Sequence, residues 1–507
     1  MNVGELISRA ARHFPKNVAW HDFFHRPVCY LELDQLTTKI SCGLLNAGLT
    51  KGDRIAILLS NGPRVIEFMV GALKAGLVIV PLNSRLQLDD QIFILRDAEC
   101  AALVFGPEFP SSATMFRQDL PELKYFFGVS DSEVTFDYRA LTTVGEKLSS
   151  SIGPEDLAWL FYTSGTTGKS KGVMLTHRNL LSMVATNLID LNPVTSTDVL
   201  LHAISLSFAG GFFMLHHLAR GVRHVFLSGS FEPKGVFKII QDERVTTVAL
   251  VPTMIHMLVR SSDRSSFDLT SLHTVFYGGA AMHGERLSEA LDAFGSIFLQ
   301  SYGLGEAPLT LTVLGKSEHT GSNAGSAGRL ATMVSLRIQD DDGLPLPNGE
   351  TGEIAVRGDI VMKGYWKRPQ ETAEALKCGW LHTGDVGSLS EEGYLFIMDR
   401  KKDLIKSGGM TIAPREVEEV LSLHSSVQEV AVVGVPDDFW GEIVKAFVVL
   451  RPGVSASEAE IMDFCKKRLA SFKKPRAVSF VKELPKSANN KILRRTLRDQ
   501  QRVESTP

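Results

Sequence analysis

Short apolar runs alternate with amphipathic stretches along most of the chain. Residues 54–59 and 78–82 are apolar runs, and residues 64–75 between them carry apolar side chains at helical spacing, which predicts a strand–helix–strand unit. Further runs of this kind lie at residues 101–105, 245–251 and 274–277. Because continuous apolar runs separated by helices are typical of parallel strands covered on both faces, the sequence predicts an α/β fold with parallel sheets.

The pattern changes near a charged run at residues 399–403, which is either a solvated turn or a linker between two bodies. Beyond it, helices are predicted at residues 416–423 and 457–469, and strands at residues 427–434 and 445–450. These elements are enough for a small α+β domain. We therefore expect a large N-terminal domain with several subdomains over residues 1–398, a junction at 399–402 and a C-terminal domain over 403–507.

Composition excludes several classes of protein. The chain has 507 residues, 44% of them hydrophobic and 22% charged, which is typical of a globular protein with two or more domains. The formal net charge of -3 argues against nucleic acid as a main partner. Five scattered cysteines without CxxC spacing predict reduced thiols and no zinc site. No apolar run reaches about 18 residues, so we expect no membrane insertion, and the cytoplasm is the expected location.

Residues 162–172 are rich in glycine, hydroxyl and lysine side chains. Glycines let backbone N–H groups converge on an anion, while hydroxyls donate and lysines neutralise charge, so this segment could hold a polyphosphate. The alternative is an ordinary solvated turn. A Walker A loop is disfavoured, because Thr163 stands where its first glycine belongs and Lys171 leads into an apolar run at 173–175. A hairpin is predicted instead, followed by a helix that Thr176 caps.

Other candidate segments also follow predicted strands. Gly278, Gly279 and Ala280 come after the run at 274–277, and Tyr302 and Gly303 follow residues 297–299. In open parallel sheets, ligands bind beyond the carboxyl ends of the strands. These segments, and Ser164 and Gly165 of the loop, are therefore at positions where a ligand is expected.

Five motifs occur in order at residues 162–172, 302–306, 380–385, 399–403 and 485–491. Together they resemble the adenylate-forming superfamily, which comprises acyl-CoA synthetases, adenylation domains of peptide synthetases and luciferases. The resemblance spans nearly the whole chain and is strongest for the acyl-CoA synthetase branch. It implies a reaction in which a carboxylic acid and ATP give acyl-AMP and pyrophosphate, after which coenzyme A displaces AMP. Mg²⁺ is the implied metal.

The resemblance also implies residue roles at the nucleotide. Thr163, Ser164, Gly165, Thr166, Thr167, Gly168 and Lys171 would bind the β- and γ-phosphates, and Thr166 and Lys171 would act in catalysis. Glu306 would ligate Mg²⁺ and serve catalysis, as a hard oxygen ligand. Adenine would stack on Tyr302 against Gly279, Ala280 and Ala281, with Ser301 and Gly303 beside it. Asp385 and Arg400 would hold the ribose.

Further roles concern the reacting groups. Lys491 would bridge the carboxylate and the α-phosphate, Lys402 would be the hinge, and Gly408 and Gly409 would lie on the path of coenzyme A. Phe208, Gly278 and Gly303 would line the acyl pocket. Two positions depart from the family: Gly305 replaces the usual threonine, and Phe208 replaces a frequent histidine. Each residue also has an ordinary alternative, such as a core aromatic for Tyr302, a surface acid for Glu306 or a solvated cation for Lys491.

The leading hypothesis is an acyl-CoA synthetase for an apolar fatty or aryl acid. Its expected partners are the acid, ATP and coenzyme A, and we allow for a homodimer. The alternatives are a catalytically silent lipid- or nucleotide-binding protein, a luciferase-like oxygenase and an enzyme that loads a carrier protein. Gly305 favours the silent protein, whereas Lys491, Glu306 and Asp385 argue against it.

Overall fold

The computed structural model describes residues 2–22, 25–129, 141, 151–163, 170–280, 282, 284–486 and 492–504. Its contacts divide the chain into two units. Unit 1 comprises Met1–Leu336, Ala355–His382 and Glu392–Leu395, and unit 2 comprises Arg337–Ile354, Thr383–Glu391 and Phe396–Pro507. The chain thus passes between the units several times, and the hinge at 399–402 stays a prediction.

The strand–helix–strand unit predicted at residues 54–82 is present in unit 1. β3 and β4 pair in parallel, and α3 (Pro63–Ala75), which starts with a proline in its first turn, connects them. Across this sheet the order is β18 (Gly364–Tyr365), β8 (Lys171–Thr176), β7 (Leu157–Thr163), β4 (Val78–Pro81), β3 (Arg54–Leu58), β5 (Cys100–Phe105) and β6 (Tyr125–Gly128). α4 (Leu88–Asp97) and α5 (Pro110–Asp119) cover it through a buried apolar cluster that includes Leu58, Ile94 and Phe116.

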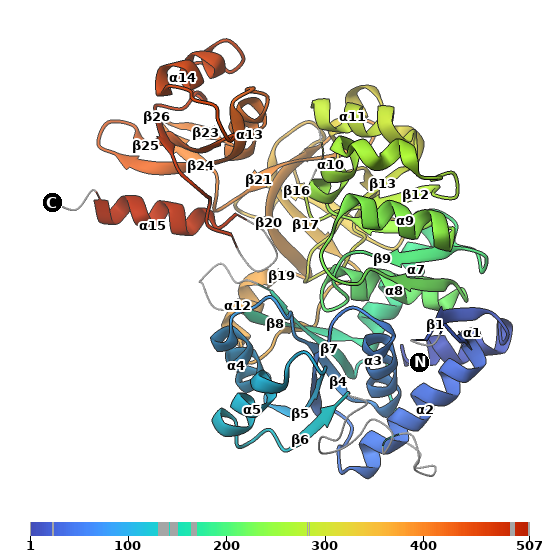
Figure 1. Ribbon diagram of the computed structural model, residues 1–507. Helices are drawn as coiled ribbons and strands as arrows, with labels where there is room; N and C mark the ends of the chain where they lie inside the picture. The colour runs from blue at the N-terminus through green and yellow to red at the C-terminus, as the bar shows by residue number, and fades with distance from the viewer. Residues whose placement is uncertain are drawn as a thin grey trace. The chain divides into compact units, whose positions relative to one another are not determined.

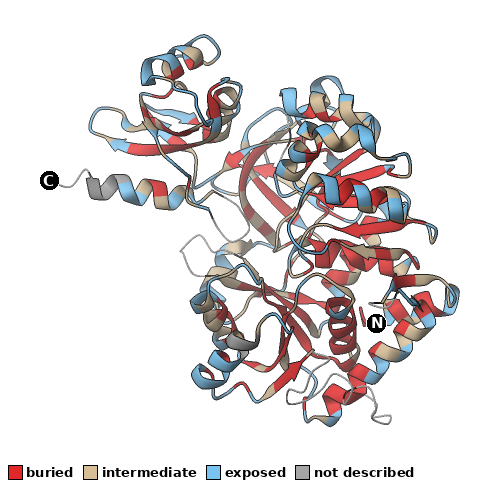
Figure 2. Cartoon of the chain, viewed as in Figure 1, coloured by how far each residue is buried: buried red, intermediate tan, exposed pale blue. Residues whose placement is uncertain are grey.

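A second mixed sheet of unit 1 is also parallel at its centre. Its order is β10 (Arg223–Phe226), β9 (Val199–His202), β11 (Thr247–Leu250), β12 (Thr274–Tyr277), β13 (Phe298–Tyr302), β14 (Thr312–Leu314) and β15 (Arg329–Leu330). α9 (Pro233–Glu243), α10 (Pro252–Arg260) and α11 (Gly284–Phe294) pack on it, as Figure 1 shows. β11 and β12 are buried throughout, and Figure 2 colours the buried residues of the sheets red. Parallel central strands confirm the α/β prediction.

Unit 1 holds further elements. They are α1 (Glu5–His13), β1 (Val18–His21), β2 (Pro27–Cys29), α2 (Tyr30–Asn46), α7 (His177–Asp190), α8 (Ala209–Ala219), η1 (Ser262–Ser266), η2 (Lys316–Glu318), η3 (Gly321–Gly325) and α12 (Pro369–Ala375). A third sheet has strands that the division into units splits between unit 1 and unit 2. Its order is β16 (Ser335–Gln339), β17 (Gly352–Arg357), β20 (Trp380–Leu389) and β19 (Leu376–Lys377), with β21 (Leu395–Arg400) beside β20.

Unit 2 contains the α+β elements predicted after the charged run. Its sheet has the order β23 (Met410–Ile412), β22 (Ile405–Ser407), β25 (Gly441–Leu450) and β24 (Val427–Asp437), with β26 (Ala477–Phe480) parallel to β25. α13 (Pro414–Ser422) and α14 (Glu458–Lys466) pack on it through Val417, Leu421 and Ile461, and α15 (Arg494–Glu504) follows. In the described part of the chain, no helix combines the length and apolar character needed to cross a membrane.

Four buried histidines form a cluster around α8 and the strands β9 and β10. The rings of His202 and His224 stack, and His202 Nε2 lies 2.8 Å from His224 Nδ1. The rings of His216 and His217 lie 4.1 Å apart, and His216 Nδ1 is 3.2 Å from the side-chain amide of Asn187. Burial lowers the pKa of His202 to about 3 and that of His217 to about 4, and it holds the pKa of His216 and His224 well below the ordinary value. All four are therefore neutral in the folded protein at pH 7.

Candidate active site

The candidate phosphate loop, residues 162–172, lies between the strands of the predicted hairpin. β7 and β8 are antiparallel, and Thr163 pairs with Lys171 at the mouth of the loop. Thr176 ends β8 and caps α7, because its hydroxyl accepts from the backbone N–H of Asn179 at 3.2 Å. A strand rather than a helix therefore follows the loop, which confirms that it is not a Walker A loop. The predicted phosphate ligands Ser164, Gly165, Thr166, Thr167 and Gly168 lie outside the described residues.

Lys171 is held by the segment around β18 and α12. Its ammonium forms an ion pair with the Glu371 carboxylate and lies 5.3 Å from the centre of the Tyr365 ring. Only 14% of the Lys171 side chain is exposed. A lysine that pairs with a carboxylate can also neutralise a phosphate oxygen in place of that carboxylate, as the predicted role of Lys171 requires.

The predicted adenine segments meet at one edge of the second sheet. β12 and β13 are parallel neighbours, so Gly278 after β12 and Tyr302 at the end of β13 lie at the same carboxyl edge. A Cβ on Gly278 would lie 2.9 Å from the Ser301 carbonyl oxygen, and one on Gly303 would lie 2.5 Å from the backbone of Leu309. Both positions therefore require glycine, independent of any ligand. Gly279 and Ala280 continue from this edge, and Ala281 lies outside the described residues.

Glu306 follows this edge and has two anchors. Its carbonyl oxygen accepts from the Met362 N–H at 2.8 Å, and its carboxylate accepts from the Tyr365 hydroxyl at 2.7 Å. In the described part of the chain, no group of three or more His, Cys, Asp or Glu side chains could hold a metal by itself. Mg²⁺ usually takes one or two carboxylates together with substrate phosphates and water, so a lone, half-buried Glu306 fits this ion.

Gly305 has a structural reason to lack a side chain. A Cβ there would lie 2.6 Å from Cγ2 of Thr163 and 3.0 Å from the Phe161 ring. The space that the family threonine would need is thus filled by β7. The departure noted in the sequence therefore reflects packing against Phe161 as well as the loss of a hydroxyl.

Gly305→Thr should destabilise the protein, because overpacking of this kind costs about 1–3 kcal/mol. Combining Gly305→Thr with Phe161→Leu should restore part of the lost free energy of unfolding, because the smaller leucine leaves room for the threonine. A double-mutant cycle measured by urea unfolding should then give a coupling energy of at least about 0.5 kcal/mol. Gly235→Thr is the control, since nothing lies within 4 Å of a Cβ at that position of α9. Additive losses at 305 and 161 would show that the Phe161 ring does not set the cost.

Phe208 lies in an aromatic group beside β7. It immediately precedes α8, is 36% exposed, and its ring centre lies 5.1 Å from that of Phe161. Phe161 in turn lies 5.0 Å from Phe212. The position that often holds histidine in the family is thus part of an apolar surface.

The predicted ribose residues Asp385 and Arg400 lie together in unit 2. Arg400 Nε is 2.7 Å from the Asp385 carboxylate, and Asp385 is buried. The backbone N–H of Asp385 donates to the Thr383 hydroxyl at 3.1 Å, which itself donates to the Ile354 carbonyl oxygen at 2.7 Å. A carboxylate fixed in this way can accept from the two hydroxyls of a ribose, as the resemblance implies.

The remaining predicted residues of unit 2 lie in turns. Lys402 lies just after β21, and its backbone carbonyl oxygen accepts a hydrogen bond from the Arg498 guanidinium at 3.3 Å. Burial lowers the pKa of the Lys402 ammonium. Gly408 and Gly409 connect β22 to β23 with φ of 55° and 80°, and a Cβ on Gly408 would lie 2.6 Å from the Trp440 ring. Lys491 lies outside the described residues.

An ion network around the predicted hinge was not foreseen from the sequence. Arg494 of α15 lies 3.3 Å from Asp399, 3.7 Å from Asp403 and 2.6 Å from Glu418. Burial raises the pKa of Glu418, and Arg494 opposes that rise. The signal that could have revealed the network is the pair of aspartates at the two ends of the charged run 399–403, but Arg494 lies 95 residues beyond Asp399.

Arg494→Ala should lower the free energy of unfolding by about 3 kcal/mol, because removing one partner leaves buried carboxylates uncompensated. Arg495→Ala is the control: its side chain is 59% exposed and pairs only loosely with Asp499 at 3.5 Å, so the expected loss is below about 1 kcal/mol. Urea-induced unfolding of both variants measures the difference. Equal losses would contradict a stabilising network at Arg494.

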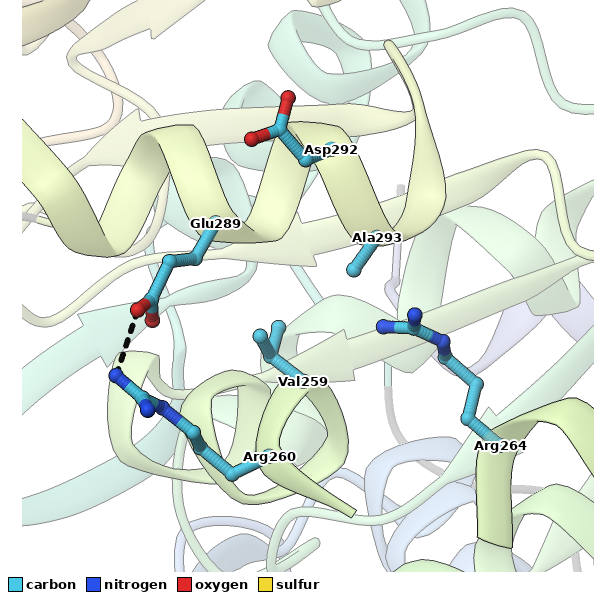
Figure 3. Close-up of a pocket in the computed structure, with 6 residues that line it drawn as sticks. All are labelled: Val259, Arg260, Arg264, Glu289, Asp292 and Ala293. Carbon is cyan, nitrogen blue, oxygen red and sulfur yellow. Dashed lines mark hydrogen bonds and ion pairs between the residues drawn. The ribbon is translucent and has the colours of Figure 1, made fainter. Parts of the chain in front are cut away.

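A separate surface pocket lies between α10 and α11. It measures about 330 Å³ and is lined by Val259, Arg260, Arg264, Glu289, Asp292 and Ala293. Arg260 Nη2 lies 2.6 Å from Glu289 Oε1, and Figure 3 marks this ion pair with a dashed line. None of the candidate site residues lines this pocket.

The α/β fold, the β7–β8 hairpin and the shared carboxyl edge of β12 and β13 are features expected of a nucleotide-binding α/β protein. The AMP-binding enzyme family matches residues 7–366, and the AMP-binding enzyme C-terminal domain matches residues 416–491. The chain therefore belongs to the AMP-binding enzyme family, within the adenylate-forming superfamily that the motifs indicated.

Individual relatives agree with this assignment. A feruloyl-CoA synthase of Amycolatopsis sp is 37% identical over 92% of this chain and 93% of its own length. The medium/long-chain-fatty-acid–CoA ligase FadD8 of Mycobacterium tuberculosis is 34% identical over 86% of this chain and 79% of its own length. The amide bond synthetase McbA of Marinactinospora thermotolerans has a similar structure, with a TM-score of 0.90, 29% identity, and coverage of 98% of this chain and 99% of McbA. The predicted fold class is confirmed.

Proposed function

We propose that this protein is an ATP-dependent, AMP-forming ligase that joins an apolar fatty or aryl carboxylic acid to coenzyme A. A carboxylate is a poor acyl donor because its leaving group would be oxide. Its attack on the α-phosphate of ATP gives acyl-AMP and pyrophosphate, and the thiol of coenzyme A then displaces AMP. The enzyme uses ATP, Mg²⁺ and coenzyme A. The family match over both parts of the chain carries this conclusion.

The residue roles at the nucleotide are part of the proposal. Bringing a carboxylate to a phosphate requires positive charge and hydrogen-bond donors where negative charge develops. Lys171 and Thr163 close the hairpin that would hold the phosphates, together with Ser164, Gly165, Thr166, Thr167 and Gly168. Tyr302 would stack on adenine beside Gly279, Ala280 and Ala281, next to Ser301 and Gly303. Glu306 would hold Mg²⁺, which neutralises phosphate charge when bound.

The roles in unit 2 are proposed in the same way. Asp385 with Arg400 would hold the ribose, supported by their 2.7 Å contact. Lys491 would bridge the substrate carboxylate and the α-phosphate. Between the two half-reactions, the C-terminal domain (residues 403–507) would rotate relative to residues 1–398. The hinge would lie at residues 399–402, with Lys402 as the residue that changes conformation. After the rotation, Gly408 and Gly409 would border the path of the thiol.

The apolar residues near the candidate site and the substrates named for the relatives both indicate an apolar acid. Phe208 and Phe161 form an aromatic surface, and the glycines at 278 and 303 keep the nearby backbone free of side chains. The named relatives are a feruloyl-CoA synthase and a fatty-acid–CoA ligase. We infer that Phe208, Gly278 and Gly303 line the acyl site and that the acid carries an apolar aromatic or aliphatic body.

Pyrophosphate exchange into ATP tests this function with a panel of acids. Ferulate, indoleacetate, decanoate and palmitate represent apolar acids, and leucine represents amino acids. We expect exchange with at least one apolar acid and, after addition of coenzyme A, loss of free thiol in proportion to AMP formed. Exchange with none of the acids would favour a silent binding protein. Exchange followed by transfer only to a carrier protein would favour a carrier-directed enzyme.

Location and assembly complete the proposal. We place the enzyme in the cytoplasm, supported by its substrates and by its five cysteines, which all lie in the described part of the chain and are free thiols. A homodimer is the assembly to test, by light scattering of the purified protein.

A further inference from the structure

One short segment contacts two residues of the candidate site. In β18, the Tyr365 hydroxyl donates to Glu306 at 2.7 Å. The Tyr365 ring also lies 5.3 Å from the Lys171 ammonium, which forms an ion pair with Glu371 of α12. The metal candidate and the phosphate-loop lysine are thus linked through the same tyrosine.

Tyr365 is itself fixed by the strand that leaves the phosphate loop. β18 pairs with β8, and Tyr365 lies opposite Val173. The backbone N–H of Tyr365 donates to the Thr372 hydroxyl at 2.9 Å, and the next N–H, of Trp366, donates to the Gly172 carbonyl oxygen at 2.8 Å. The position of the hydroxyl is therefore set by backbone pairing rather than by a mobile loop.

A hydroxyl that donates to a metal-binding carboxylate holds that carboxylate in one orientation. A glutamate side chain has several rotatable bonds and loses rotamer freedom when it is fixed. The Tyr365 hydroxyl fixes Glu306 in advance, while each carboxylate oxygen keeps lone pairs for a cation. Outer hydrogen bonds of this kind orient metal ligands, and their loss typically costs about 10–100-fold in metal affinity.

We propose that Tyr365 is a positioning residue that orients the Glu306 carboxylate for the Mg²⁺ that accompanies ATP. This inference rests on the proposed function. It goes beyond that function because Tyr365 lies outside the motifs noted in the sequence and yet would orient the metal ligand. Through the pairing of β18 with β8, the position of that ligand would also depend on β8.

Tyr365→Phe removes the hydroxyl and keeps the ring near Lys171. Calorimetric titration of Mg²⁺ into the full-length protein, saturated with α,β-methylene-ATP so that no adenylation occurs, should give a Kd for Mg²⁺ raised about 10–100-fold. Tyr394→Phe is the matched control: the Tyr394 hydroxyl donates to Glu318 at 2.6 Å, the same chemical pair in the same unit. The control should bind Mg²⁺ like the wild type.

The outcomes separate this inference from the proposed function. Wild type that binds no Mg²⁺ with the analogue would overturn the metal role of Glu306, and the inference with it. Normal binding by wild type together with unchanged binding by Tyr365→Phe would overturn the inference alone. An equal weakening in Tyr365→Phe and Tyr394→Phe would assign the effect to general loss of stability. Thermal unfolding of both variants, with expected Tm values close to that of wild type, confirms that each is folded.

Discussion

Replacing Lys491 by alanine should slow acyl-adenylate formation by about 10²–10³-fold, while thioester formation from supplied acyl-AMP stays near the wild-type rate. A single cation that stabilises charge in a transition state typically contributes about 3–4 kcal/mol, which corresponds to this loss. The role is confined to the first half-reaction, because only there do a carboxylate and a phosphate, both negatively charged, approach each other. The second half-reaction has already lost pyrophosphate.

The two half-reactions can be measured separately. Pyrophosphate exchange reports the first, and release of AMP from synthetic acyl-AMP and coenzyme A reports the second. Lys486→Ala is the control from the same C-terminal segment, since Lys486 pairs with Glu429 at 2.7 Å in a solvated position. We expect that control to retain both rates. An equal loss of both rates in Lys491→Ala would reject the proposed role.

Acidification should destabilise the protein strongly between pH 7 and pH 5. Histidines in the unfolded chain titrate near pH 6.5, whereas burial holds the folded pKa of His202 at about 3 and of His217 at about 4, with His216 and His224 also well below the ordinary value. Below pH 6.5 the unfolded chain therefore binds more protons than the folded protein. Each such histidine lowers the free energy of unfolding by about 1.4 kcal/mol per pH unit, so stability is present above pH 6.5 and is lost as the pH falls.

Urea unfolding at pH 7, 6 and 5 measures this loss, and we expect several kcal/mol in total by pH 5. His13→Gln, at an exposed position, should leave the pH dependence unchanged. Carbon-13 spectra of histidine-labelled protein supply a second measurement, in which the buried imidazoles should stay neutral down to pH 5. Folded-state titration of His202 and His224 near pH 6.5 would contradict the account.

Local pattern predicted the parts of the fold and site that depend on neighbours in sequence. The turn chemistry of residues 162–172 and the apolar run after Lys171 were enough to predict the β7–β8 hairpin. Thr176 could be predicted as a cap because threonine is a preferred N-cap residue, and the N–H it accepts from belongs to Asn179, only three residues away. Strand ends predicted that Gly278 and Tyr302 would share an edge, since carboxyl ends of parallel neighbours coincide.

Contacts between distant segments could not be predicted. Tyr365 and Glu306 are separated by 59 residues, and Tyr365 belongs to none of the motifs noted in the sequence. Arg494 and Asp399 are separated by 95 residues. Gly305 was interpreted only as a missing hydroxyl, because the Phe161 ring that fills its space comes from another strand. Such contacts depend on how whole sheets pack, and the pattern of residues along the sequence does not specify that packing.

The central claim is that the carboxylate oxygen of the acid attacks the α-phosphate of ATP. Turnover of an accepted acid that carries ¹⁸O at both carboxylate oxygens, with ATP and coenzyme A, tests this directly by mass spectrometry of the products. Attack at the α-phosphate followed by thiol displacement leaves one carboxylate oxygen on AMP, so we predict one ¹⁸O in each AMP and none in pyrophosphate. Label in phosphate or pyrophosphate, or AMP without label, would contradict an acyl-adenylate route.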